Sequence, residues 1–182
     1  MMNKNLILII VYIFMFSQSN AETVFIDEFN QKNEWNFITD QVMGGTSKGT
    51  YNYEKINNDY VVKITGNVST KNNGGFIQIR RNLNNVNLTN ARNLEVIAKG
   101  NNEKYFVHLR TTFTLLPWQY YQHSFIVKKD FKNFILPIRN FTKSGFLLPD
   151  QINPKNIKSI GIVAFGKDFN ADLTVKKISF KK

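Results

Sequence analysis

The sequence predicts an all-β fold, an antiparallel jelly-roll sandwich with about ten strands and few or no helices. Three observations lead to this prediction. Apolar and polar residues alternate in many short segments, which is the pattern of half-buried strands. No stretch longer than about ten residues has the three-and-four spacing of an amphipathic helix. Turn signals rich in glycine and asparagine separate the segments.

The alternating segments follow one another along nearly the whole chain. In order, the predicted strands are Val24–Phe29, Lys48–Tyr53, Tyr60–Asn67, Gly75–Leu83, Leu94–Lys99, Tyr105–Thr112, Tyr120–Val127, Asn133–Pro137, Ser159–Phe165 and Asp172–Phe180. No internal repeat, linker or low-complexity segment interrupts the series. A chain of 182 residues is therefore expected to hold one domain, over residues 22–182.

Alternation also predicts the face of the sheet on which each side chain lies. In the strand that begins at Gly75, Ile77 and Ile79 share one face, and Phe76, Gln78 and Arg80 share the other. In the strand that begins at Tyr105, the side chains of Tyr105, Val107 and Leu109 oppose those of Phe106, His108 and Arg110.

The last strand changes parity along its length. Leu173 and Val175 occupy odd positions, whereas Ile178 and Phe180 occupy even ones. An extra residue inserted in the ladder would keep all four on one face, so a β-bulge is predicted at Lys176-Lys177.

The N-terminus has the organisation of a signal peptide. A short basic region with Lys4 precedes the apolar run Leu6–Phe16, and Ser19 and Ala21 are small residues placed for cleavage after Ala21. The apolar run is shorter than the roughly 20 residues that a membrane span needs. Residues 1–21 are therefore predicted to be removed, which leaves an exported protein, periplasmic or secreted, without a transmembrane anchor.

Composition excludes several classes of site. The chain has no cysteine and two histidines, so disulfides, thiol catalysis and Cys- or His-rich metal sites are excluded, and no cofactor is expected. The formal net charge of +11 raises the question of nucleic acid. Because the lysines are spread along the chain rather than clustered with arginine and aromatic residues, a nucleic-acid partner is not expected.

Two glycine-rich segments carry the most specific pattern. The first runs from Trp35 to Gly49 and contains Asp40-Gln41-Val42-Met43-Gly44-Gly45-Thr46-Ser47. The second runs from Gly66 to Arg80 and contains Asn73-Gly74-Gly75-Phe76. Together they resemble the signature of the complex I intermediate-associated protein 30 family. Later pieces agree in order, among them Tyr121-Gln122-His123-Ser124-Phe125 and Pro137-Ile138-Arg139-Asn140-Phe141.

The resemblance implies a jelly roll of the galactose-binding-domain-like type. Mitochondrial members of the family assist assembly of NADH:ubiquinone oxidoreductase, and no catalytic chemistry is established for the isolated domain. This sequence departs from the pattern in its export signal and in having Phe131 and Phe134, with no tryptophan, before Pro137. An exported protein would not meet the matrix-side or cytoplasmic arm of that enzyme.

Candidate binding residues come from the two glycine-rich segments and one aromatic loop. They are Trp35, Asp40, Met43, Gly44, Gly45, Ser47, Asn73, Gly74, Gly75, Arg80 and Trp118. Two interpretations stay open for Asp40 and Arg80, which either pair to clamp the loops to one sheet or hydrogen-bond a polar ligand. The glycines either serve only as turns or expose backbone N–H groups to a ligand. Trp118 follows a proline in a predicted loop, where an exposed ring could pack on a sugar.

The sequence therefore predicts an exported, non-enzymatic binding module that acts as an assembly or adaptor factor for a protein client. A carbohydrate-binding module is the alternative. A hydrolase that uses Asp40 with a second carboxylate is the remote one, because no nucleophile–base set is visible and no catalytic residue is assigned.

Overall fold

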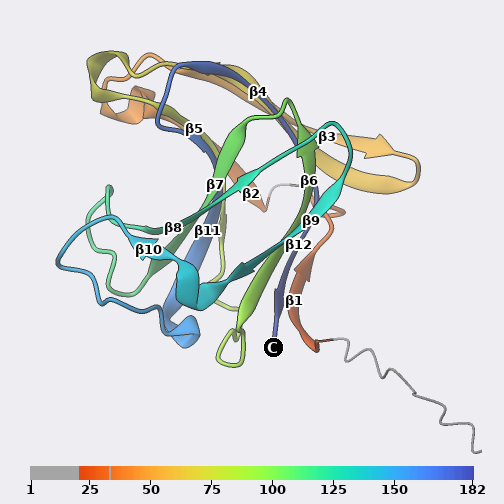
Figure 1. Ribbon diagram of the computed structural model, residues 1–182, viewed down its shortest axis with the longest axis vertical. Helices are drawn as coiled ribbons and strands as arrows, with labels where there is room; N and C mark the ends of the chain where they lie inside the picture. The colour runs from red at the N-terminus through yellow and green to blue at the C-terminus, as the bar shows by residue number, and fades with distance from the viewer. Residues whose placement is uncertain (1–20, 33) are drawn as a thin grey trace, which may run out of the picture.

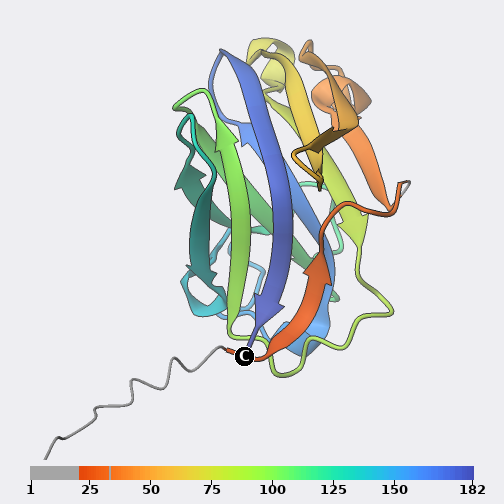
Figure 2. The same cartoon turned by 90° about the vertical axis from the view of Figure 1, so that its right-hand side faces the viewer.

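The computed structural model describes residues 21–32 and 34–182, which form two six-stranded antiparallel sheets packed face to face (Figures 1 and 2). The first sheet has the order β3-β4-β12-β6-β9, with β1 also paired to β12. The second has the order β10-β8-β7-β11-β5-β2. The all-β sandwich predicted from the sequence is confirmed.

The strands are β1 (Thr23–Asp27), β2 (Trp35–Thr39), β3 (Lys48–Ile56), β4 (Asp59–Val68), β5 (Phe76–Asn82), β6 (Asn93–Gly100), β7 (Lys104–Thr111), β8 (Tyr121–Ile126), β9 (Lys132–Pro137), β10 (Thr142–Lys143), β11 (Ile157–Phe165) and β12 (Phe169–Lys181). Four short 3-10 helices join them: η1 (Asp40–Met43), η2 (Lys71–Asn73), η3 (Ile138–Asn140) and η4 (Pro154–Asn156).

Each of the predicted strands is present, with ends that differ by a few residues, and two strands were missed. The missed strand β2 has only 5 residues and alternates weakly, since Trp35 and Phe37 share a face but Ile38 is also apolar, and its residues were interpreted as part of a glycine-rich segment. The other missed strand, β10, has only 2 residues, which is too short for a period to show.

The long strand β12 organises the first sheet, as Figure 2 shows. Its first half pairs with β4 and its last residues pair with β1, while β6 follows its other side. The predicted bulge is confirmed, because Val175 pairs with Ala98 and Lys177 pairs with Ile97, which leaves Lys176 as the extra residue. The bulge lets the apolar residues on both sides of it enter the same core.

The core lies between the two sheets and follows the predicted alternation. The first sheet contributes Val62, Ile64, Leu94, Val96, Leu173 and Phe180, and the second contributes Ile77, Ile79, Tyr105, Val107, Leu109 and Ile162, all buried. The alternate residues of β5, β7 and β11 therefore point away from the core, onto the outer face of the second sheet.

The first residues of β1 lie beside the end of β12, where the Lys182 N–H donates to the Glu22 carbonyl at 2.9 Å. Among residues 21–32 and 34–182, no helix is long and apolar enough to cross a membrane. The predicted signal peptide, apart from Ala21, lies outside the described residues.

Candidate functional site

A groove of about 800 Å³ crosses the outer face of the second sheet. One wall is the glycine-rich region, with Met43, Asn73 and Gly74, and the opposite wall is the β7–β8 connection, with Trp118. The two regions lie on the left of the molecule in Figure 1, on either side of the outward face of β5, β11 and β7. Most of the lining is apolar or aromatic, which is typical of ligand grooves.

The floor of the groove is a row of residues at matching register positions. Gly161 of β11 pairs with Arg80 of β5 on one side and with His108 of β7 on the other. Because Gly161 has no side chain, the centre of the floor stays low between the two larger side chains. A Cβ placed there would come closest to the Gln78 Oε1 atom, at 2.9 Å, at the flexible end of that side chain, and would make ordinary contacts with the Ile79 carbonyl and with Val163, at 3.6 and 3.7 Å.

An aromatic cluster forms one side of the floor. The imidazole of His108 stacks on the ring of Tyr120, with ring centroids 3.9 Å apart and planes 8° from parallel. Phe165 meets both rings edge-on, at 5.7 Å and 6.4 Å. Burial lowers the pKa of His108 to about 3, an effect that the side chain of Gln122 offsets only in part, so the imidazole is neutral at neutral pH.

Hydrogen bonds from two polar side chains stabilise the connection between β7 and β8. Arg110 donates hydrogen bonds to the carbonyls of Thr114, at 3.0 Å, and Leu116, at 2.9 Å. The side chain of Gln119, which is buried, accepts from the Leu116 N–H at 3.0 Å. Trp118 remains 62% exposed on this hydrogen-bonded loop, so its ring is accessible to a ligand.

The two glycine-rich loops meet at the carboxylate of Asp40, which is fully buried. Its Oδ1 accepts from the Ser47 N–H at 2.9 Å. Its Oδ2 accepts from the Ser47 hydroxyl at 2.5 Å and from the N–H groups of Gly75 and Phe76 at 2.5 and 3.2 Å. Burial by itself would raise the pKa of this carboxyl, but these hydrogen bonds outweigh burial, and the pKa of Asp40 lies below its ordinary value.

At this junction, Gly45 and Gly74 are required because there is no room for a side chain, and not because a turn needs a positive φ. A Cβ on Gly45 or on Gly74 would overlap the Asp40 carboxylate. The glycines thus let two loops approach one buried anion closely. The N–H groups of Gly45 and Gly74 donate to the carbonyls of Asp40 and Lys71, and the Gly75 N–H donates to the Asp40 carboxylate. Ser47, also fully buried, links the loops further by accepting from the Ser69 N–H at 2.9 Å.

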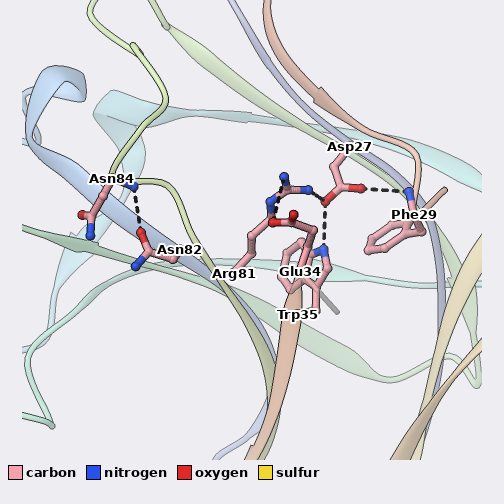
Figure 3. Close-up of polar contacts among 7 residues, drawn as sticks. All are labelled: Asp27, Phe29, Glu34, Trp35, Arg81, Asn82 and Asn84. Atoms are coloured by element: carbon pink, nitrogen blue, oxygen red, sulfur yellow. Dashed lines mark hydrogen bonds and ion pairs between the residues drawn. The ribbon is translucent and has the colours of Figure 1, made fainter. Parts of the chain in front are cut away.

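The proposed pairing of Asp40 with Arg80 is wrong, because the oxygens of Asp40 are taken up by Ser47 and by backbone N–H groups. The ion pair of this region joins the neighbouring arginine, Arg81, to Asp27 on β1 (Figure 3). The indole N–H of Trp35 also donates to Asp27, at 2.8 Å. Arg81 has the parity of Ile77 and Ile79 and therefore points inward, whereas Arg80 points outward.

The predicted site residues divide into two sets. Met43, Asn73, Gly74, Arg80 and Trp118 line the groove. Trp35, Asp40 and Ser47 are buried and belong to the framework, and Gly44, Gly45 and Gly75 lie outside the groove lining. Sequence reasoning missed the lining residues Gln78, His108, Arg110, Tyr120, Gly161 and Phe165. Their parity was visible for β5 and β7, but nothing in the sequence showed that the outer face of these strands is hollowed.

Among the residues that the structure describes, no aspartate and no glutamate lines the groove. In the described part of the chain, no three His, Asp or Glu side chains gather in a way that would hold a metal ion. What the arrangement offers is shape, aromatic surface and cationic side chains.

The chain belongs to the complex I intermediate-associated protein 30 family, whose model matches residues 16–175. The match begins inside the predicted signal peptide. No curated protein matches the chain significantly.

The solved structures that resemble this chain include carbohydrate-binding modules, and they also include larger proteins such as an exo-beta-agarase, of which 25% is covered, with a TM-score of 0.55 and 8% identity. The chain is similar to the family 11 carbohydrate-binding module of a cellulosomal cellulase of Clostridium thermocellum, with a TM-score of 0.69 and 12% identity over 88% of this chain and 94% of that one. A family 11 module of the same organism, in complex with a β-1,3-1,4-mixed-linked tetrasaccharide, gives a TM-score of 0.66 and 11% identity, with 85% and 92% covered. A family 30 carbohydrate-binding module gives a TM-score of 0.52 and 12% identity over 75% of this chain and 92% of that one. At these identities the similarity establishes the fold.

Proposed function

We propose that this member of the complex I intermediate-associated protein 30 family is a non-catalytic module that binds a glycan chain in the groove of the second sheet. The observation that carries the proposal is the aromatic lining of the groove, with Trp118 exposed on one wall and the stacked pair of Tyr120 and His108 on the floor. Aromatic faces pack well on the apolar faces of sugar rings, and ordered rings lose little entropy on binding.

Two further observations support a binding role without catalysis. Glycosidic bonds are usually hydrolysed by a pair of carboxylates, and no carboxylate from the described part of the chain lines the groove. A module with the same fold has been solved with a bound tetrasaccharide, which makes a glycan ligand compatible with this architecture. Fold similarity alone is a weak argument for function, so the proposal rests on the groove.

Affinity gel electrophoresis against a panel of soluble polysaccharides tests the proposal. We expect at least one polysaccharide to retard the protein, and Trp118→Ala and Tyr120→Ala to reduce the retardation about tenfold each. Tyr60→Ala is the matched control, because Tyr60 is an exposed aromatic residue on the first sheet. If no polysaccharide is bound, or if all three variants behave alike, the groove is not a glycan site.

A protein partner is the second candidate, and a separate surface favours it. Large apolar side chains project from the β7–β8 and β10–β11 connections, namely Phe113, Leu115, Phe146 and Leu147, each more than half exposed. The connections are linked at their bases, where the Ser144 N–H donates to the Tyr120 carbonyl at 2.9 Å. Exposed apolar patches on a monomer commonly mark interaction sites, and the family name points to complex assembly.

The double variant Phe146→Ser/Leu147→Ser separates the two candidates. An adaptor role predicts that a defined complex co-purifies with the wild-type protein and is lost with the double variant, while polysaccharide retardation is unchanged. If the wild-type protein and the double variant recover the same proteins, the result would count against a protein partner at these loops.

We also propose that residues 1–21 direct export and are removed. The prediction is a mature N-terminus at Glu22, read by mass spectrometry of the protein recovered from the producing cells. An intact N-terminus on protein from the cytoplasm would contradict export.

A further inference from the structure

We propose that the ligand of the groove is an acidic glycan, whose carboxylate or sulfate groups are bound by Arg80, Arg110 and Lys158 at one end of the groove. The inference rests on the proposed glycan-binding function and specifies the chemical class of the ligand.

The groove continues into a second hollow of about 330 Å³, and the two share Arg80, Arg110 and Ser159 in their linings. Lys158 lines only the second hollow. Counting residues 21–32 and 34–182, neither hollow is lined by an aspartate or a glutamate. Three cationic side chains therefore gather around one continuous surface, with no lining carboxylate to neutralise them.

Arg80 is unusual among the basic residues of this region. Its neighbour Arg81 is paired with Asp27 and Glu34. Within residues 21–32 and 34–182, Arg80 itself makes no ion pair and no side-chain hydrogen bond, although it is half-buried on the groove floor. A guanidinium in such a place has all its N–H donors available, and carboxylate and sulfate groups match its planar geometry.

Arg110 and Arg80 lie close enough for their positive charges to interact. Burial lowers the pKa of Arg110, and the charge of Arg80 lowers it further. Two like charges held near each other in a partly desolvated floor repel, and an anion placed between them would relieve that repulsion. Arg110 is fixed by its bonds to the carbonyls of the β7–β8 connection, so the anion site is built before any ligand arrives.

The chemistry of the groove changes along its length in a way that fits an acidic sugar polymer. The end near η1 and η2 is apolar and aromatic, with Met43, Phe76 and Phe165. The end at the second hollow combines the cations with Asn36, Asn82 and Asn84, whose amides can bond sugar hydroxyls. The net charge of +11 would also draw a polyanion toward the molecule.

Isothermal titration calorimetry with four polymers tests the inference. Polygalacturonate and dextran sulfate are the acidic glycans, mixed-linkage β-glucan is the neutral glycan, and polyglutamate is a polyanion without sugar. We expect an acidic glycan to bind more tightly than the neutral glucan and polyglutamate, with an affinity that falls as NaCl is raised from about 50 mM to about 300 mM.

Three variants locate the site. Arg80→Gln removes an unpaired guanidinium and should weaken the acidic glycan about tenfold or more, and Lys158→Gln should weaken it by a smaller factor. Both should weaken the binding of any neutral glycan by a clearly smaller factor than the binding of the acidic glycan. Lys132→Gln is the matched control, because Lys132 is exposed on β9 of the first sheet, and it should change nothing.

Each other outcome overturns the inference in a different way. Equal loss of acidic and neutral glycans in Arg80→Gln would keep the groove as a glycan site and reject its acidic selectivity. If polyglutamate binds tightly and Arg80→Gln and Lys132→Gln weaken its binding equally, general charge attraction explains the binding, and the acidic-glycan site in the groove is rejected. Binding of a neutral glycan alone would reject the acidic ligand, and binding of none of the four would reject the acidic ligand together with the proposed function for these polymers.

Discussion

The junction of the glycine-rich loops and the groove beside it share residues of the same chain segments, yet their polar groups are used in opposite ways. At the junction, both oxygens of Asp40 accept hydrogen bonds and a buried charge is fully solvated by N–H and O–H donors. In the groove, Arg80 has no polar partner in the described structure and faces an open hollow. Satisfied buried groups hold a fold together, and unsatisfied, accessible groups are available to a ligand.

The most specific residues of the sequence thus serve mainly the framework. Asp40, Gly45, Ser47 and Gly74 form a compact polar junction that closes one wall of the groove without contributing its own charge to the surface. The same segments hold both kinds of residue, because Asp40 and Ser47 are buried in the junction whereas Met43, Asn73 and Arg80 line the groove. Four experiments separate the two roles, in order of decreasing effect.

Removal of the buried carboxylate gives the largest expected effect. Asp40→Ala leaves the N–H groups of Ser47, Gly75 and Phe76 without their acceptor, so we expect a loss of about 3–5 kcal/mol in the free energy of unfolding, measured by denaturant titration. Asp168→Ala is the control, because Asp168 also accepts from the Thr70 N–H, at 2.7 Å, but at the surface, and a much smaller loss of stability is expected. An unchanged midpoint for Asp40→Ala would show that the junction does not depend on the carboxylate.

Acid should destabilise the protein through His108. The unfolded chain takes up a proton near pH 6.5 and the folded protein only near pH 3, so between these values the unfolded state binds more protons and stability falls as pH is lowered. We expect a loss of about 2–3 kcal/mol between neutral pH and about pH 4.5. His108→Phe, which keeps a ring against Tyr120, should remove most of this dependence. Asp40 contributes to this acid sensitivity only at lower pH. Because its pKa in the folded protein lies below its ordinary value, the stability that the Asp40 carboxylate provides is lost as pH falls through that lowered pKa.

Two neighbouring arginines provide the sharpest contrast between the regions. Arg81→Ala breaks the ion pair with the buried Asp27, and because Trp35 and Phe29 still donate to that carboxylate, a loss of about 1–3 kcal/mol is expected. Arg80→Ala should stay within about 0.5 kcal/mol, since no polar contact is lost. Differential scanning calorimetry of the two variants measures both. Equal destabilisation would mean that Arg80 is also part of the framework.

The smallest effect on stability is expected at the centre of the groove floor. Gly161→Ala adds a Cβ that the flexible end of Gln78 can avoid, so the free energy of unfolding should change by about 1 kcal/mol or less. Gly161→Leu should block the floor and lower glycan affinity about tenfold. Gly145→Leu, at a glycine with open space around it, is the control for affinity. Retained affinity in Gly161→Leu would move the binding site away from this floor.

Much of the fold was predictable because strands carry a local signal. The parity of Ile77 and Ile79 in β5 predicts which face enters the core, and the parity change between Val175 and Ile178 predicts the bulge at Lys176. The same parity places Arg80 on the outer face and Arg81 on the core face. The Asp40–Arg80 pair was therefore in conflict with the parity of β5, because it followed the motif and not the face.

The sequence by itself determined the all-β class, the inward and outward faces of the strands and the importance of the two glycine-rich segments. Tertiary structure alone decided that Asp40 is solvated by backbone N–H groups from a loop 35 residues away and that Arg81 pairs with Asp27. It also brought Arg80, Gly161 and His108, from three strands, into one row. The physical reason is that alternation is a property of each strand, whereas pairing partners and the hollow on an outer face depend on strand order and on which loops rise beside the sheet.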